Sequence, residues 1–238
     1  MNEMTVLVAG ASGRTGRDVL DVLLDAGIRV RALTSSPGKV ETLELQGADE
    51  VVVGDLLSIS AAREAVEGAD AVICAVGSTP GANLLRGPLV DREGVVNLVD
   101  AAADEGVDRF VLVSSIGVGD SKEGMPKPFR ALLDLFGILD AKEAGEEHLR
   151  RSGLDYTIVR PGGLTNDPAT GDVLVGEGGD TVSGSIPRAD VARLLVAALF
   201  TPESENRTFE VVSREGRRGS ATGVVDVDWR HPEPVVER

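Results

Sequence analysis

The feature that most constrains this chain is an apolar segment that leads directly into three closely spaced glycines. Residues 5–9 form the apolar segment, and Gly10, Gly13 and Gly16 follow in a GxxGxxG spacing. An amphipathic helical pattern covers 14–26. A strand, a glycine turn and a helix in this order present free N–H groups and a positive helix dipole to a nucleotide diphosphate. The alternative, a purely structural turn, is less favoured because the glycines stand between a strand and a helix. The predicted nucleotide-binding residues of the turn are Gly10, Ala11, Ser12, Gly13, Arg14, Thr15 and Gly16.

The junction after the second expected strand, 28–33, bears on the choice between NAD and NADP. An NAD site places a carboxylate here to bind the ribose 2′-hydroxyl, yet no Asp or Glu occurs between Ile28 and Val40. Hydroxyl and cationic side chains suit a 2′-phosphate, so we expect NADP rather than NAD. The alternative is that Ser-Ser-Pro-Gly is only a turn before the next helix. The predicted 2′-phosphate ligands are Thr34, Ser35 and Ser36, with Arg14, Arg31 and Lys39 within reach.

Strand and helix patterns alternate about seven times, which predicts an α/β fold with a Rossmann-type doubly wound parallel sheet of about seven strands flanked by helices. We expect a single NAD(P)-binding domain at 1–213, a small excursion on the substrate side at 162–187, and a partly ordered C-terminal tail at 214–238 held by Trp229. A loop is expected at 78–88. A second, longer loop at 116–136 is a candidate lid, since long loops usually carry function. The further expected strands are 50–53, 70–77, 108–115, 155–163 and 208–212, and the helices are 40–45, 58–66, 89–105, 138–151 and 188–200.

Ligands of open α/β sheets bind at the carboxyl ends of the strands. At the end of the third strand, Asp55 could accept a hydrogen bond from adenine while Leu56 packs on the ring. Asp55 could equally cap the following helix. Asn97 interrupts an apolar helical pattern, and it either bonds backbone near the cofactor or faces solvent. The end of the fourth strand supplies three further predicted cofactor contacts, Ala75, Val76 and Gly77.

Composition excludes several classes of partner and site. Acidic residues outnumber basic ones 39 to 24, giving a net charge of −15, which argues against nucleic acid or an anionic membrane as partner. A single cysteine, Cys74, excludes a disulfide within the chain, and two histidines provide no metal site. We expect a cytoplasmic protein, since no signal peptide is visible. The many Asp and Glu with few Lys resemble proteins of halophilic archaea, although acidity alone also favours solubility.

The chain resembles the atypical short-chain dehydrogenase/reductases of the NAD(P)-binding, NmrA-like family, which includes biliverdin-IXβ/flavin reductases and nucleotide-sugar epimerases. The segments that carry the resemblance are 10–16, 30–33, 54–56, 110–115, 156–164 and 186–192. It implies NADP laid across the carboxyl ends of the strands. It places the nicotinamide near Ser114, Pro161 and Gly162, and Gly163 and Leu164 are further predicted cofactor contacts.

One departure from this family concerns its Tyr-x-x-x-Lys motif, whose tyrosine delivers a proton to the substrate. Lys142 matches the lysine, but Ile138 stands at the tyrosine position, and the single tyrosine, Tyr156, begins a strand at the opposite end of the sheet. Lys142 is predicted to bind the nicotinamide ribose, against the alternative of an exposed helix lysine. Ser114 or Ser115 could hydrogen-bond a substrate carbonyl. Ser114, Ser115 and Lys142 are therefore the predicted catalytic residues.

Three functions fit these observations. The first is an NADPH-dependent oxidoreductase that transfers a hydride to a small acceptor such as a flavin, quinone or carbonyl, which needs little acid from the protein. The second is a non-catalytic NADP(H)-binding redox sensor that acts through a protein partner. The third is a nucleotide-sugar epimerase or dehydratase, which ranks last because it needs a base at Ile138. The expected assembly is a monomer or dimer.

Overall fold

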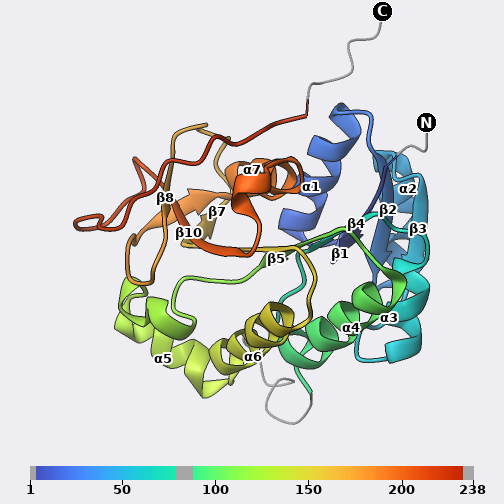
Figure 1. Ribbon diagram of the computed structural model, residues 1–238, viewed down its shortest axis with the longest axis horizontal. Helices are drawn as coiled ribbons and strands as arrows, with labels where there is room; N and C mark the ends of the chain where they lie inside the picture. Colours follow the sequence, from blue (N-terminus) through green and yellow to red (C-terminus); the bar gives the residue numbers. More distant parts are fainter. Residues whose placement is uncertain (1–3, 79–87, 233–238) are drawn as a thin grey trace, which may run out of the picture.

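A computed structural model describes residues 4–78 and 88–232 of the chain (Figure 1). Its central sheet has eight strands in the order β3-β2-β1-β4-β5-β6-β10-β8. Only β8 runs antiparallel to its neighbour, so the prediction of a doubly wound parallel sheet is confirmed and one edge strand is added. The strands are β1 (Thr5–Ala9), β2 (Arg29–Thr34), β3 (Glu50–Val53), β4 (Ala71–Cys74), β5 (Arg109–Val113), β6 (Tyr156–Pro161), β8 (Val173–Gly176) and β10 (Arg207–Ser213). A separate parallel pair joins β7 (Gly163–Thr165) to β9 (Ser185–Pro187).

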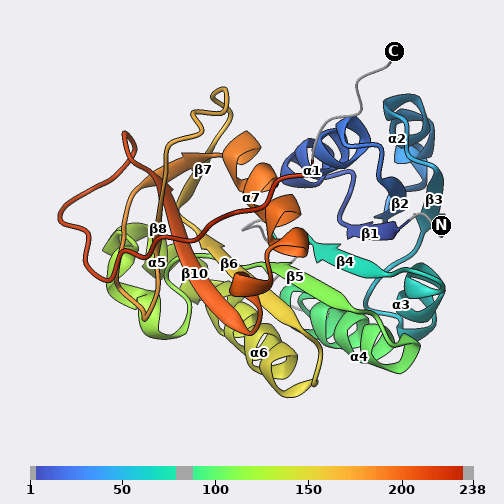
Figure 2. The same cartoon turned by 45° about the horizontal axis from the view of Figure 1, so that its top comes forward.

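Helices cover both faces of the sheet (Figures 1 and 2). One face carries α1 (Arg14–Asp25) and α7 (Arg188–Phe200), which pack against each other. The other face carries α3 (Ile59–Val66), α4 (Val95–Glu105) and α6 (Ile138–Arg151), while α2 (Val40–Gln46) lies beside β3. This three-layer arrangement buries the central strands on both faces, which explains their nearly continuous apolar sequences.

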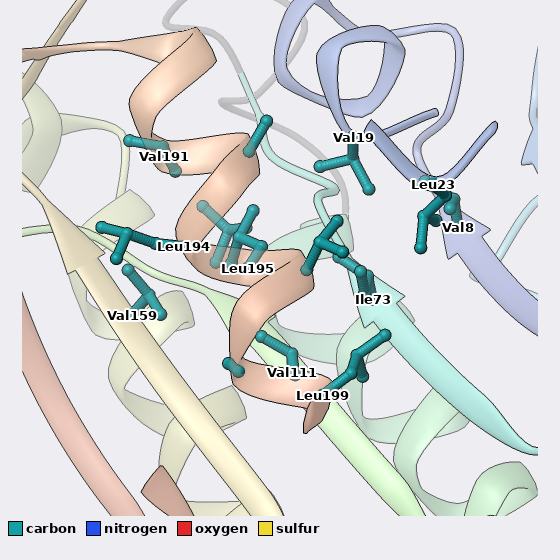
Figure 3. Close-up of a cluster of buried hydrophobic side chains, with 14 of the residues drawn as sticks. Val8, Val19, Leu23, Ile73, Val111, Val159, Val191, Leu194, Leu195 and Leu199 are labelled. Carbon is teal, nitrogen blue, oxygen red and sulfur yellow. The ribbon is translucent and has the colours of Figure 1, made fainter. Parts of the chain in front are cut away.

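Helix α7 lies at the centre of the core on its face of the sheet (Figure 3). Nine of its thirteen residues are buried, as expected of a helix enclosed by a sheet and a second helix. Side chains of α7 meet strand residues that point to the same face because strand side chains alternate. The cluster labelled in Figure 3 includes Val191, Leu194, Leu195 and Leu199 of α7 and, from four neighbouring strands of the sheet, Val8, Ile73, Val111 and Val159.

The prediction of a long loop at 116–136 is wrong, because most of this segment is helical. A 3₁₀ helix covers Gly119–Gly124, and α5 (Lys127–Leu135) packs on α6. The glycines and prolines of this segment hid the amphipathic pattern of α5, whose Leu133 is buried. Pro128 is compatible with the helix because it lies in the first turn, where its missing N–H is not needed.

Two further segments differ in detail from expectation. The helix expected at 89–105 begins with a π-helical turn at Val90–Gly94 before α4. The excursion at 162–187 contains β7, β8 and β9, and β8 pairs with β10 at the sheet edge. The loop expected at 78–88 falls almost entirely on residues 79–87, which lie outside the described residues.

The segment that follows β10 returns across β8 and α7, where Figure 1 shows it in red. Val225 donates a backbone hydrogen bond to Val175 of β8 at 3.0 Å. The Trp229 ring packs edge-on against Phe209 at 5.5 Å between centroids, so the expected contact between Trp229 and the body of the protein is present. Within 4–78 and 88–232, no helix is both long enough and apolar enough to cross a membrane.

Candidate functional site

The glycine turn after β1 is held tightly against its surroundings. The N–H groups of Gly10 and Ala11 both donate to the carbonyl of Leu33, at 3.2 and 3.1 Å. Gly10 has a φ of +81°, which side chains disfavour. A Cβ at Gly16 would overlap the carbonyl oxygen of Gly10. Glycines are therefore required at both positions, and the turn leads into α1 at the point where strand order reverses between β1 and β4.

The predicted 2′-phosphate residues lie in two places, one beside the glycine turn and one, for Arg31, farther away. Ser12 and Thr34 share a hydrogen bond of 2.8 Å between their hydroxyls, and the backbone N–H of Ser36 donates to the Thr34 hydroxyl at 3.2 Å. These side chains and exposed Ser35 therefore adjoin the glycine turn. The structure overturns the assignment of Arg31. Its guanidinium bonds Glu50 and the backbone carbonyl of Glu67 at the C-terminal end of α3, away from the strand ends.

A cavity of about 840 Å³ extends from the glycine turn along the carboxyl ends of the central strands. Its lining joins most of the predicted site residues to a second, largely apolar region. The predicted residues among them are Gly13, Arg14, Thr15, Ala75, Val76, Gly77, Ser114, Ser115, Lys142, Pro161, Gly162, Gly163 and Leu164. The apolar region is formed by Met125, Pro126, Pro128, Phe129, Leu133, Ile138 and Leu139.

Lys142 is not an exposed helix lysine. Its ammonium lies 2.8 Å from the carboxylate of Asp91, whose side chain is fully buried, and Lys142 itself is only 15% exposed. The other carboxylate oxygen of Asp91 accepts the N–H of Ser78 at 2.8 Å. Burial opposes ionisation of Asp91, yet Lys142 and Ser78 together hold its pKa below the ordinary value. The pair thereby fixes an ammonium beside Gly77, at the end of β4.

Sequence reasoning missed Asp91 because an acid at a helix start has an ordinary explanation, namely its attraction to the helix dipole. The π-helical turn at Val90–Gly94 carries Asp91, and such turns are frequent at functional sites. The available signal was its spacing, because Asp91 stands four residues before Val95, a buried residue of α4. The side-chain amide of Asn97 donates to the backbone carbonyl of Leu56 at 2.8 Å. Of the two alternatives for Asn97, the structure therefore shows the bond to backbone.

The two serines at the end of β5 differ in their hydrogen bonding. The Ser115 hydroxyl donates to the carbonyl of Ile116 at 2.8 Å. The Ser114 hydroxyl is buried and has no hydrogen-bond partner among the described residues, although Ser114 lines the cavity. Buried polar groups without partners are rare in native proteins and call for an explanation. A ligand oxygen in the cavity would supply the missing partner.

Asp55 bonds locally. Its carboxylate accepts the N–H of Leu57 at 3.0 Å and its carbonyl accepts the N–H of Ser58 at 2.8 Å, a turn that begins α3. Leu56 is buried in the core under α3 and α4. Neither residue is part of the cavity lining described above. The N-cap residue of α3 is Ser58, and no side chain hydrogen-bonds to the first turn of the helix. The capping alternative for Asp55 is therefore wrong, because its carboxylate stabilises the turn before the helix.

Arg188 is a cavity residue that sequence reasoning did not place at the site, although its segment carried the family resemblance. It stands at the start of α7 and lines the cavity together with Arg14 of α1. It donates to the carbonyl of Thr165 at 3.0 Å. Burial and the neighbouring charge of Arg14 lower the pKa of Arg188. Two adjacent arginines repel each other, so an anion between them would be stabilising.

Three residue types that often carry chemistry lie elsewhere. Tyr156 begins β6 at its amino end, as expected from the sequence. His148 bonds Asp100 at 2.6 Å on the surface. Burial raises the pKa of Cys74 to about 12, so its thiol stays protonated and unreactive at neutral pH. Within 4–78 and 88–232, no three His, Cys, Asp or Glu side chains form a possible metal site.

Residues 10–202 match the protein family described as NAD(P)H-binding. The chain is 41% identical over 218 residues to an uncharacterised chloroplastic protein of Arabidopsis thaliana, covering 88% of this chain and 76% of the relative. It is also 31% identical over 264 residues to sanguinarine reductase of Eschscholzia californica, covering 92% and 93%.

Two solved structures are similar over nearly their whole length. One is described as an NAD-dependent epimerase/dehydratase from Bacillus halodurans, with a TM-score of 0.78 and 32% identity over 92% of this chain and 96% of that chain. The other is ChuY, an anaerobilin reductase of Escherichia coli O157:H7, with a TM-score of 0.79 and 25% identity over 91% and 100%. These relatives include enzymes named as reductases and one named as an epimerase.

Proposed function

Since the chain belongs to the NAD(P)H-binding family, we propose that it is an NADPH-dependent reductase that transfers a hydride to a small organic acceptor. The observation that carries this proposal is the single cavity that joins the glycine turn to an apolar region across Ser114 and Lys142. A nucleotide at the turn and an acceptor in the apolar region would then meet at the ends of β4 and β5. Enclosure of both reactants in one site favours hydride transfer through proximity.

The residues present fit a dinucleotide with an extra phosphate. The glycine turn excludes side chains where a pyrophosphate would approach the backbone. Arg14 and Arg188 adjoin that turn, and no described Asp or Glu lines the cavity. In addition, residues 34–39, which follow β2 where an NAD site places a carboxylate for the ribose 2′-hydroxyl, contain no Asp or Glu. We therefore propose NADPH rather than NADH as the preferred cofactor, with Ser12, Thr34, Ser35 and Ser36 near the 2′ position.

When bound, NADPH supplies a hydride, that is, a proton with two electrons, and leaves as NADP⁺. The Ser114 hydroxyl would donate to the acceptor oxygen or nitrogen that gains negative charge, since it has no other partner. Lys142, held by Asp91, would orient the nicotinamide ribose and place a positive charge nearby. The reduced acceptor then takes one proton from solvent, because apolar Ile138 stands where the superfamily uses a tyrosine.

The two alternatives are distinguished by the same site. An epimerase must remove a proton from a sugar hydroxyl, and buried, apolar Ile138 provides no base for this step. A redox sensor would bind NADPH at the glycine turn and perform no turnover. A sensor without turnover has no acceptor to enclose, so the apolar region of the cavity would have no role, and we rank this function second.

The test is NADPH oxidation, followed by absorbance in high-salt and low-salt buffers with flavin, quinone and carbonyl acceptors. We expect turnover with at least one acceptor, and tighter binding of NADPH than of NADH by calorimetry. Arg14→Gln should reduce the preference for NADPH about tenfold, whereas Arg193→Gln, an equal change of charge on α7, should leave it unchanged. Binding without any turnover would favour the sensor, and no binding of either nucleotide would reject both.

A further inference from the structure

The charges around the cavity differ from those of the chain as a whole. The chain carries 39 acidic and 24 basic residues, yet no described acidic residue lines the cavity. Four cationic residues do: Arg14, Lys142, Arg188 and Arg218. Arg14 and Arg188 lie at the nucleotide end, and Lys142 is paired with Asp91. The proposed function gives these three a role and leaves Arg218 without one.

Arg218 lies at the opposite end of the cavity from the glycine turn. Its backbone N–H donates to the carbonyl of Ser183 at 2.7 Å. The Ser183 hydroxyl in turn donates to the carbonyl of Gly124 at 2.6 Å. Gly124 and the adjacent Met125 belong to the segment that forms the apolar region. Arg218 is therefore tied to the acceptor end and not to the nucleotide end.

The backbone that carries Arg218 is fixed by close packing on the strand before α7. The N–H of Ser185 donates to the carbonyl of Gly216 at 3.0 Å, and the N–H of Gly216 donates to the Ser213 hydroxyl at 2.9 Å. A Cβ at Gly216 would lie 2.5 Å from the carbonyl oxygen of Ser185, so glycine is required for this approach. A fixed backbone reduces the entropy lost when the arginine binds a ligand.

The Arg218 side chain has no carboxylate partner among residues 4–78 and 88–232, and it is exposed. Its neighbour Arg214 does have one, Asp172 at 2.9 Å. The lining residues between Met125 and Leu139 are all apolar. An arginine at the rim of an apolar cavity matches a ligand with an apolar body and one anionic group.

We propose that the acceptor is an aromatic or conjugated molecule that carries a carboxylate or phosphate, and that Arg218 binds this anionic group. The proposal rests on the proposed function, because it assigns the apolar region to the acceptor. It makes Arg218 a specificity-determining residue of that site. Acceptors with the same ring and no anionic group would lose this ion pair and bind more weakly.

Riboflavin and flavin mononucleotide test this directly, since they share one ring system and differ by a phosphate. Quenching of flavin fluorescence measures the binding of each to the full-length protein saturated with NADP⁺. We expect flavin mononucleotide to bind at least tenfold more tightly than riboflavin. Arg218→Gln should remove most of this preference and leave riboflavin binding unchanged.

Arg217→Gln is the matched control, because it removes the same charge from an exposed neighbour that does not line the cavity. It should keep the preference for flavin mononucleotide. Equal binding of the two flavins to the wild type, an equal loss in both variants, or no binding of either flavin would overturn the proposal. Fluorescence reports binding without turnover, so a preference without NADPH oxidation would support Arg218 and reject the reductase.

Discussion

The two ends of the cavity are constructed in different ways. At the nucleotide end, the cavity lining comes from two short stretches after neighbouring strands, residues 13–15 after β1 and 75–78 after β4, together with Arg188 at the start of α7. At the acceptor end, the lining comes from four segments: 113–142, 161–164, 184–185 and the residue Arg218. Phosphate binding at the first end depends on backbone geometry, which the glycine turn provides. The second end depends on side chains, so it can vary with the substrate while the fold is retained.

The largest expected effect concerns the backbone of the nucleotide end. Gly16→Ala places a Cβ onto the carbonyl oxygen of Gly10, so the turn must open. We expect NADPH affinity to fall at least a hundredfold by calorimetry, with a native circular dichroism spectrum. Gly38→Ala is the control, because a Cβ there meets nothing within 4 Å. If Gly16→Ala kept its affinity for NADPH, the backbone of the turn would not be what determines binding at the nucleotide end.

The next effect concerns the point where the two ends meet. Lys142→Met leaves the buried carboxylate of Asp91 without its cation, which should cost about 3 kcal/mol of unfolding free energy. Adding Asp91→Asn should restore most of this stability, because the amide keeps the hydrogen bond from Ser78 and carries no charge. Chemical denaturation measures both variants.

Turnover separates the structural role of this pair from its role in the site. We expect NADPH oxidation to stay at least tenfold lower in both the single variant and the double variant, because both lack the ammonium. If the stabilised double variant regained full activity, Lys142 would be a structural residue only.

A smaller effect compares the two serines after β5. Ser114→Ala removes a hydroxyl that bonds nothing in the described structure, so stability should change little while turnover falls about tenfold. Ser115→Ala removes a hydrogen bond to the carbonyl of Ile116 and should cost about 1 kcal/mol of stability without slowing turnover. Activity and denaturation curves of the two variants give the comparison, and identical profiles would contradict it.

The last effect lies in the sheet, beneath both ends of the cavity. In the folded protein burial raises the pKa of Cys74 to about 12, whereas an unfolded thiol ionises near a pKa of about 8.5. The contribution of this thiol to the free energy of unfolding should therefore be complete below about pH 8.5. Above that pH it should decline by about 1.4 kcal/mol per pH unit. Cys74→Ala should remove that part of the alkaline slope in denaturation measured at pH 8 and pH 10. An unchanged slope would show that the thiol is not protected.

The sequence predicts the glycine turn well because its determinants are local. The spacing of Gly10, Gly13 and Gly16 implies the turn, and the missing acid after β2 lies in one short window. The acceptor end is harder to predict because its contacts join residues far apart in the chain. Asp91 meets Lys142 across 51 positions, and Arg218 is held at the cavity by two backbone hydrogen bonds to a distant segment, its own to Ser183 and the one between Gly216 and Ser185.

Helix α5 also shows that local sequence patterns do not predict every element. Gly117 and Gly119 suggested a long loop, yet the helix forms because Leu133 and its neighbours pack on α6. Arg31 shows the opposite error. Its position in the strand was predicted correctly, but its side chain had a partner, Glu50, that only the sheet register brings near.

The placement of β8 has a consequence for how the protein is synthesised. The sheet order puts β10 between β6 and β8, so β8 has no strand to pair with until residues 207–213 have left the ribosome. The residues of the glycine turn, β2 and β4 are synthesised long before that point, but α7, which covers β1 and β4, follows only at residues 188–200. A nascent chain would thus receive the last residue of its nucleotide end, Arg188, before β10, and the segment that carries Arg218 only after β10.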